Sequence, residues 1–286
     1  MLVSPLAIRP MRRADLDIAI DWAAAEGWNP GLYDADAFLA ADPQGFLMGW
    51  LGDEPVACIS VVAYGAAYGF LGFYICRPEF RGRGHGWALW QAGIARLGER
   101  TIGLDGVVAQ QANYAKSGFA TAHRNIRMGG TAATREIADS HIVELHPSRP
   151  TGLAGSIVAY DRALHAGPRE AFLRAWLMPP GRRTLACVEA NSICGYACVR
   201  ACRQGHRIGP LFADTPEIAE RLFSALAGRL YGAPIFLDVP EPNAEAVALA
   251  KRHGLEPVFE TARMYRGPAP ASPLQRTFGI TTFELG

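Results

Sequence analysis

The chain has 286 residues, of which half are hydrophobic and 19% are charged, so it can bury the cores of two ordinary domains. Its formal net charge of +1 argues against nucleic acid or an anionic membrane surface as a partner. The longest apolar runs are shorter than a membrane span, and no apolar segment follows the arginines near the N-terminus, so no signal peptide is expected. We therefore expect a cytoplasmic protein without membrane or nucleic-acid partners.

Six cysteines are present, and Cys194, Cys198 and Cys202 recur at intervals of four. Residues 193–202 have the pattern of a strand, which would spread these three thiols over roughly 26 Å at the usual rise per residue. That span is too long for one metal ion. We therefore expect no metal, and we interpret the cysteines as small buried hydrophobic side chains in a reducing compartment.

In chain order, the first half reads as a strand, two helices, three strands, a helix, a strand, a helix and a strand. The first two of the three consecutive strands form a hairpin around the turn at residues 52–55. The expected elements are residues 8–11, 15–25, 34–40, 46–51, 56–64 and 70–76, a helix opening at Gly84, residues 101–104, a helix holding Asn113 and Tyr114, and residues 123–128.

The most informative segment is Arg-Gly-Arg-Gly-His-Gly at residues 81–86, called the Gly-rich turn below. It follows the apolar strand at residues 70–76 and precedes apolar residues at helical spacing. Such a turn leaves backbone N–H groups unpaired at the positive end of the helix dipole. The glycines admit a ligand close to the backbone and the arginines add positive charge, so the turn is predicted to bind an anion, with a pyrophosphate as the expected ligand. The alternative is a surface turn that only connects two elements.

Two common phosphate-binding motifs do not fit the Gly-rich turn. A P-loop needs Gly-Lys followed by Ser or Thr, and that sequence occurs nowhere in the chain. A dinucleotide fingerprint needs a third glycine where Trp87 stands, and an acidic residue about twenty positions further on in a parallel sheet. The spacing therefore excludes both motifs.

The turn instead fits the pattern Arg/Gln-x-x-Gly-x-Gly/Ala through Arg81, Gly84 and Gly86, and it resembles the acetyl-CoA-binding motif of the GNAT N-acyltransferase superfamily. Residues 113–119, Asn-Tyr-Ala-Lys-Ser-Gly-Phe, are similar to that family's Asn/Tyr helix and to the Gly-Phe that opens its next strand. The two motifs occur in the family's order, which makes the pair much more specific than either alone.

The resemblance implies roles for both motifs. The strand at residues 70–76 would splay from its neighbour so that its backbone can pair with the pantetheine arm of acetyl-CoA, while the turn binds the pyrophosphate. Tyr114 matches the tyrosine that protonates the departing thiolate, although a ring packed against the sheet is the alternative. Cys76 is interpreted as a backbone contact and not as a nucleophile. The expected cofactor-binding residues are Ile75, Cys76, Arg77, Arg81, Gly82, Arg83, Gly84, His85, Gly86 and Asn113.

The residues that bind the acceptor are less clearly marked in the sequence than those that bind the cofactor. In this fold the acceptor is usually bound by the first helices and their loop, which here carries Glu26, Trp28, Asn29 and Tyr33. Aromatic residues with acidic neighbours can hold an amine or its cation, whereas a loop pinned to the core by its tryptophan is the alternative. No general base can be chosen: Asp105 and Glu26 are the candidates, and an amine that binds deprotonated needs none.

The second half of the chain repeats the first. Gly118-Phe119 recurs as Gly254-Leu255 at an offset of 136 residues, and Leu104-Asp105 recurs as Leu237-Asp238 at an offset of 133. This layout resembles bacterial GNAT proteins with an additional C-terminal acetyltransferase-like domain. It implies an α+β fold, similar to an α/β sandwich, of tandem GNAT-like domains, each a mixed, mostly antiparallel sheet flanked by helices. We place the domains at residues 1–130 and 131–286.

The second half lacks the cofactor features of the first. Residues 207–216 contain one glycine followed by Pro210, which has no N–H, and Asp214 puts a negative charge beside the helix start. Ala250 stands where the first half has Tyr114. Residues 131–286 are therefore predicted to form a GNAT-like domain without the pyrophosphate loop. A strand at residues 141–145 is expected to open it, and residues 278–285 to pair as a last strand with residues 263–266.

Together these features predict an acetyl-CoA-dependent N-acetyltransferase that moves an acetyl group to a primary amine by direct transfer in a ternary complex. A second domain that covers the cleft would favour a small-molecule amine. The alternatives are a non-catalytic acyl-CoA-binding or sensing protein and a protein-lysine acetyltransferase. The amine, the acyl chain and the choice between monomer and homodimer stay open.

Overall fold

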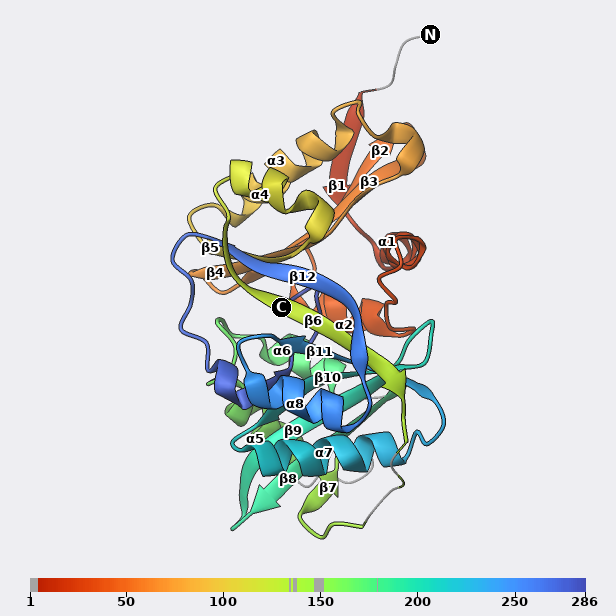
Figure 1. Cartoon of the computed structure of the whole chain (residues 1–286). Helices are drawn as coiled ribbons and strands as arrows, with labels where there is room; N and C mark the ends of the chain where they lie inside the picture. The colour runs from red at the N-terminus through yellow and green to blue at the C-terminus, as the bar shows by residue number, and fades with distance from the viewer. Residues whose placement is uncertain (1–4, 134, 136–137, 147–151, 179) are drawn as a thin grey trace.

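The computed structural model describes residues 5–133, 135, 138–146, 152–178 and 180–286. Over these residues the chain forms two halves that share one continuous sheet of thirteen strands (Figure 1). The strands follow the order β1-β2-β3-β4-β5-β12-β6-β11-β10-β9-β8-β7, and β13 pairs with β10 beside this path. The predicted mixed, mostly antiparallel architecture with flanking helices is confirmed, but the sheets of the two halves are joined into one.

The two halves run through the same series of elements. The first half contains β1 (Leu6–Pro10), α1 (Arg13–Ala25), α2 (Asp34–Ala41), β2 (Phe46–Leu51), β3 (Glu54–Tyr64), β4 (Tyr68–Cys76), α3 (His85–Leu97), β5 (Thr101–Val107), α4 (Gln111–Lys116) and β6 (Ala120–Thr131). The second contains β7 (Ile142–Glu144), α5 (Leu153–Asp161), α6 (Glu170–Trp176), β8 (Arg182–Glu189), β9 (Ser192–Ala201), β10 (His206–Ala213), α7 (Pro216–Gly228), β11 (Pro234–Pro240), α8 (Ala244–Arg252), β12 (Glu256–Arg266) and β13 (Thr277–Gly279).

The predicted repeat is confirmed at the glycines that open β6 and β12. Gly118 and Gly254 have φ angles of +86° and +71°, and neither has a neighbouring atom within 4 Å of where a side chain would begin. Both positions need glycine because the backbone turns through the left-handed region between the helix and the strand that follows it.

The last repeated strand of each half crosses into the sheet of the other. Residues 261–266 of β12 pair with residues 102–107 of β5, and residues 125–131 of β6 pair with residues 234–240 of β11. The exchanged strands β6 and β12 also pair with each other, and in Figure 1 they run side by side between the halves. Neither half completes its sheet alone, and the division of domains at residue 130 stays a prediction.

Three hydrophobic cores hold the layers together. One lies between the first half of the sheet and α3, a second between the other half and α7 and α8, and the third joins the two halves. In this shared core Phe38 of α2 stacks on Trp176 of α6, with ring centroids 6.0 Å apart. Burying each such side chain contributes about 1.5–3 kcal/mol, so the halves stabilise one another.

The predicted pairing of the tail is wrong. Only Thr277–Gly279 forms a strand, and β13 pairs with β10 instead of the segment at residues 263–266. The reason is that β12 already has β5 on one side and β6 on the other, so it offers no free edge. Residues 280–286, called the C-terminal tail below, leave the sheet and return to the first half. The predicted strands at residues 141–145 and 193–202 are confirmed as β7 and β9.

Candidate active site

A gap between β4 and β5 creates the main cavity. The two parallel strands pair only from Tyr68–Thr101 to Leu71–Leu104, although β4 continues to Cys76 and β5 to Val107. Phe73 has a φ of +45° and lies at an irregularity in the pairing of β4 with β3. Beyond Leu71, β4 pairs with no strand of the described residues on its β5 side, and the predicted splay is confirmed.

The cavity has a volume of about 600 Å³, within the range of small-molecule sites. Its walls come from β4, the Gly-rich turn, α4 with the segment before it, the loop after α1, β12 and the C-terminal tail. The residues on which the argument below depends are Glu26, Trp28, Gly72, Ile75, Cys76, Arg81, Gly82, Gly84, Gly86, Asp105, Tyr114, Phe259, Thr261, Phe283 and Glu284.

The Gly-rich turn has the geometry of an anion site. Gly82 and Gly84 have φ angles of +75° and +84°, and the space where a side chain would begin at either residue is open to at least 4 Å. Gly84 caps α3, and among the described residues no acceptor is found for the backbone N–H groups of residues 82–85 and 87, whereas the Gly86 N–H donates to the Cys76 thiol. Gly86 brings α3 close to β4, because a Cβ there would lie 3.0 Å from the Tyr74 hydroxyl. Five N–H groups at the turn and the helix start are thus left for an anion to accept from.

The arginines around the turn form hydrogen bonds and ion pairs with other residues of the chain. The Arg81 guanidinium donates from Nε to the Cys76 carbonyl at 2.8 Å and from Nη2 to the Glu26 carboxylate at 2.5 Å. Arg77 forms ion pairs with Glu54 and Glu79. The structure therefore places Arg81 as a bridge between the turn and the end of α1, a contact that sequence spacing did not predict.

Three predicted cofactor-binding residues, Arg83, His85 and Asn113, do not line the cavity. The Arg83 guanidinium is 5.5 Å from the centroid of the Phe80 ring, and the His85 ring is 6.4 Å from it. Asn113 is exposed and donates to the Gln110 side chain at 2.9 Å, and it does not line the cavity. Its predicted contact with the pantetheine arm therefore needs a different side-chain position.

Tyr114 lies inside the cavity, 8% exposed, with its ring stacked on Trp90 at a centroid distance of 5.4 Å. Burial raises the pKa of its phenol, so the hydroxyl stays protonated and is suited to donate a proton. Burial also raises the pKa of the Cys76 thiol, with Arg81 acting in the opposite sense. A protonated thiol is a poor nucleophile, as the sequence interpretation expected.

The acceptor residues separate into two pairs. Glu26 and Trp28 line the cavity. Asn29 and Tyr33 instead face the second half: the Asn29 amide donates to the Gln204 carbonyl at 2.9 Å, and the Tyr33 carbonyl accepts from Arg182 at 2.8 Å. The loop thus forms one wall of the cavity and also joins the two halves.

Of the two carboxylates considered as a general base, Asp105 accepts hydrogen bonds at both of its oxygens. Its side chain is completely buried and accepts from Arg263 at 2.8 and 2.9 Å and from Asn125 at 2.7 Å. Glu26 is paired with Arg81. Both carboxylates are therefore neutralised by arginines.

Sequence reasoning missed the wall supplied by the second half. Phe259 and Thr261 come from the exchanged strand β12, and Phe283 and Glu284 come from the C-terminal tail. Glu284 is 3% exposed, and burial raises the pKa of its carboxyl group. No local motif marks these positions, because they reach the cavity only through the strand exchange and the path of the tail.

The equivalent gap in the second half is filled by the chain itself. The parallel pairing of β10 with β11 ends at Ile208 and Leu237, and β13 then pairs with β10 at Leu211. At the start of α7, the Thr215 hydroxyl accepts from the Ile218 N–H at 3.3 Å. The second gap is thus filled by a strand and its helix start is capped by a side chain.

One group of possible metal ligands occurs among the described residues: Cys187, Glu189 and Cys194, whose ligand atoms lie within 4.8 Å of one another. Glu189 is ion-paired with Arg221 at 2.7 Å, and Cys194 donates to the Cys187 carbonyl at 3.3 Å. The group lies on β8 and β9, away from the cavity.

Comparison with known proteins relates both halves to one family. Residues 13–119 match the acetyltransferase (GNAT) family, and residues 157–279 match an acetyltransferase (GNAT) domain. A holothin acyltransferase from Pseudoalteromonas sp. (strain SANK 73390) is 31% identical over 279 residues, which cover 97% of this chain and 94% of that protein.

Solved structures share the fold over the whole chain. A putative acetyltransferase from Pyrococcus horikoshii has a TM-score of 0.81 at 22% identity, covering 100% of this chain and 98% of that one. A tandem GNAT protein from the clavulanic acid biosynthesis pathway has a TM-score of 0.64 at 17% identity, with coverages of 93% and 100%. In the part of the chain that the structure describes, no helix has the length and apolarity needed to cross a membrane.

Proposed function

The chain belongs to the GNAT family of acyltransferases, and on this premise we propose that it is an acetyl-CoA-dependent N-acetyltransferase acting on the primary amine of a small molecule. The observation that carries the proposal is the single cavity that joins the Gly-rich turn, the splayed part of β4 and Tyr114 to a separate wall built by the second half. One space can then hold both substrates, which suits direct transfer in a ternary complex.

The residues at the turn fit the CoA pyrophosphate. Unpaired N–H groups at the start of α3 and the open space beside Gly82 and Gly84 would hold the phosphates, and Arg83 between these glycines adds a positive charge. The part of β4 that has splayed from β5, which includes Ile75 and Cys76, would bind the pantetheine amides. The bound thioester supplies the activated acyl group, and the protein's part is to position it.

Tyr114 would donate the proton that the departing sulfur needs. Its buried phenol stays protonated well above neutral pH, and its position in the cavity below the Gly-rich turn agrees with that role. No covalent acyl-cysteine is required, since burial keeps the Cys76 thiol protonated.

A small acceptor is favoured by the additional wall of the cavity. Phe259, Thr261 and Phe283 of the second half line the cavity, which leaves less room for the lysine of a folded protein. The names of two similar proteins point to particular compounds, holothin for one and clavulanic acid biosynthesis for the other. The described cysteines are all unpaired, which agrees with a reducing cytoplasm, and a monomer or homodimer is proposed.

Release of free CoA from acetyl-CoA in the presence of a panel of small amines tests the proposal, with propionyl-CoA and longer acyl-CoAs in parallel. We expect turnover with at least one amine. Tyr114→Phe should lower kcat about 10²-fold with little change in the affinity for acetyl-CoA, because only the proton donor is lost. Tyr231→Phe, at an exposed position in the second half, is the matched control and should behave as wild type.

Two other outcomes would replace this proposal. Tight binding of acetyl-CoA without turnover of any amine would identify a sensing protein. Acetylation of intact proteins without turnover of small amines, seen by mass spectrometry, would identify a protein-lysine acetyltransferase.

A further inference from the structure

The C-terminal tail is held firmly against the first half. The Ser60 hydroxyl donates to the Glu284 carbonyl at 3.3 Å, and the Tyr64 hydroxyl donates to the Leu285 carbonyl at 3.0 Å. Gly72 of β4 faces the Glu284 carbonyl so closely that a Cβ there would overlap its oxygen. Leu285 is fully buried in the core shared by the two halves. Residue 284 is therefore placed precisely beside the point at which β4 leaves β5.

Glu284 presents a carboxylate that the protein satisfies only in part. Oε2 accepts a hydrogen bond from the Thr282 hydroxyl, while among the described residues no donor reaches Oε1. The residue is 3% exposed and lines the cavity. Buried polar atoms in proteins normally have hydrogen-bond partners. A buried carboxylate oxygen without a donor, at the wall of a substrate cavity, therefore indicates a contact with a ligand.

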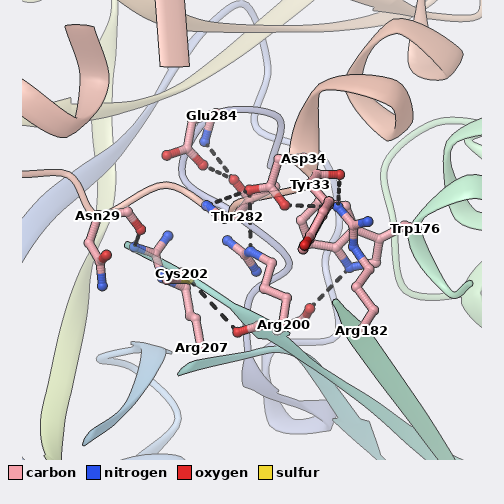
Figure 2. A network of polar contacts seen from close by, with 12 residues as sticks. Asn29, Tyr33, Asp34, Trp176, Arg182, Arg200, Cys202, Arg207, Thr282 and Glu284 are labelled. Carbon is pink, nitrogen blue, oxygen red and sulfur yellow. Dashed lines mark hydrogen bonds and ion pairs between the residues drawn. The ribbon is translucent and has the colours of Figure 1, made fainter. Parts of the chain in front are cut away.

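Buried charged residues surround Glu284, and Figure 2 shows Asp34, Arg200 and Arg207 among them. Arg200 pairs with Asp34 at 3.3 Å, and Arg207 lies 3.8 Å from Asp238. Nη2 of Arg200 and Nη1 of Arg207 are buried and have no hydrogen-bond partner among the described residues. Arg127 completes the arginines that act on Glu284. These arginines supply positive charge that favours the ionised carboxylate without a direct ion pair that would occupy it.

The opposing effects on the pKa of the Glu284 carboxyl group suit a general base. Burial and the nearby Asp34 raise the pKa of its carboxyl group, Arg207, Arg200 and Arg127 lower it, and the net direction is upward. The carboxylate is therefore more basic than an exposed one. The other two carboxylates at the cavity are already ion-paired, Asp105 with Arg263 and Glu26 with Arg81.

We propose that Glu284, carried by the second half, is the general base that deprotonates the acceptor amine in the cavity of the first half. This inference rests on the proposed function. An amine that enters as an ammonium ion gives one proton to Glu284, its nitrogen forms the C–N bond, and the C–S bond to CoA breaks. The sulfur takes its proton from Tyr114, a second proton lost from the nitrogen restores Tyr114 through solvent, and the third stays as the amide N–H, while Glu284 releases its proton to water. The products are the amide, CoA thiol and one proton.

Glu284→Gln tests the general base with two amines, of which only one is protonated at neutral pH and must lose a proton before it attacks. The probes are acetyl-CoA with an alkylamine such as benzylamine or tryptamine, which is protonated at neutral pH, and an arylamine such as p-anisidine, which is neutral. At pH 7 the variant should lose about 10²-fold in kcat/KM for the alkylamine and much less for the arylamine. Raising the pH to about 9.5 should restore most of the alkylamine rate, because the free amine then forms in solution.

Controls separate this role from a structural one. Glu245→Gln, exposed on α8, should match wild type throughout. The melting temperature of Glu284→Gln should not fall below that of wild type, because an amide is easier to bury than a carboxylate. Were it to fall, Glu284→Asp provides a second test: it keeps the charge and retracts it, so it should again lower the alkylamine rate far more than the arylamine rate.

Two results would overturn the proposal while leaving the proposed function intact. One is a Glu284→Gln variant with a wild-type pH profile for the alkylamine. The other is an equal loss for both amines that high pH does not restore, which would make Glu284 a structural residue. A wild-type protein that turns over no amine would instead overturn both inferences together.

Discussion

Gly72 is the position at which β4 lies against the C-terminal tail, and Gly72→Ala probes how firmly the tail is held. The new Cβ would lie 2.9 Å from the Glu284 carbonyl carbon and closer still to its oxygen, an overlap that a backbone must relieve by moving. Moving the tail breaks the hydrogen bonds from Ser60 and Tyr64, worth about 1 kcal/mol each. Overpacking adds about 1–3 kcal/mol.

The variant should therefore lose about 3–5 kcal/mol of unfolding free energy, which corresponds to a fall of roughly 10 °C in Tm. Thermal melts and urea unfolding measure the loss, and the rate of CoA release should fall with it because Glu284 is displaced. Gly155→Ala is the matched control. Gly155 lies in α5 with nothing within 4 Å of a new Cβ, so the same substitution should stabilise the protein by about 0.5–1 kcal/mol. A Gly72→Ala variant with wild-type Tm and wild-type turnover would refute the reasoning that the tail is locked against β4.

Three further predictions concern other parts of the molecule. Gly84→Ala forces a side chain into a φ of +84° at a cost of about 1–2 kcal/mol and should weaken acetyl-CoA binding about tenfold by calorimetry, while Gly98→Ala, similarly strained at φ +60° beyond α3, should not change that affinity. Asp105→Asn removes the partner of the buried Arg263 and should cost about 3–5 kcal/mol in urea unfolding; a loss below about 1 kcal/mol would show that the pair does not join the halves. Burial lowers the pKa of His165 to about 3, so the unfolded chain binds its proton first and stability should decline as the pH falls from about 6.5 toward 3. Tm measured between about pH 7.5 and 5 should fall less steeply in His165→Gln, and equal slopes would contradict this assignment.

Local features of the chain were predictable because short-range physics decides them. The strand, Gly-rich turn and helix at residues 70–97 follow from apolar periodicity and from glycines that the left-handed backbone at Gly82 and Gly84 requires. The repeat was visible for the same reason: Gly118 and Gly254 mark one backbone turn in each half. The splay of β4 from β5 was expected from the family resemblance, and the register confirms it.

The pairing of strands that lie far apart in the sequence was not predictable. An alternating strand pattern specifies which face is buried and leaves open which strand lies alongside, so the exchange of β6 and β12 had no signal in the sequence. The tail was assigned to β12 for this reason, although both edges of β12 were already occupied.

The sequence by itself determined the family, the doubled plan, the Gly-rich turn and Tyr114, because each depends on residues adjacent along the chain. The tertiary structure alone decided which residues of the second half line the cavity and which of its carboxylates are ion-paired. Asp105 and Glu26 looked equally suitable as isolated residues, and only packing shows that arginines neutralise both. Glu284, close to the end of the chain, reaches the cavity because β13 fills the gap in the second half and directs the tail back into the first.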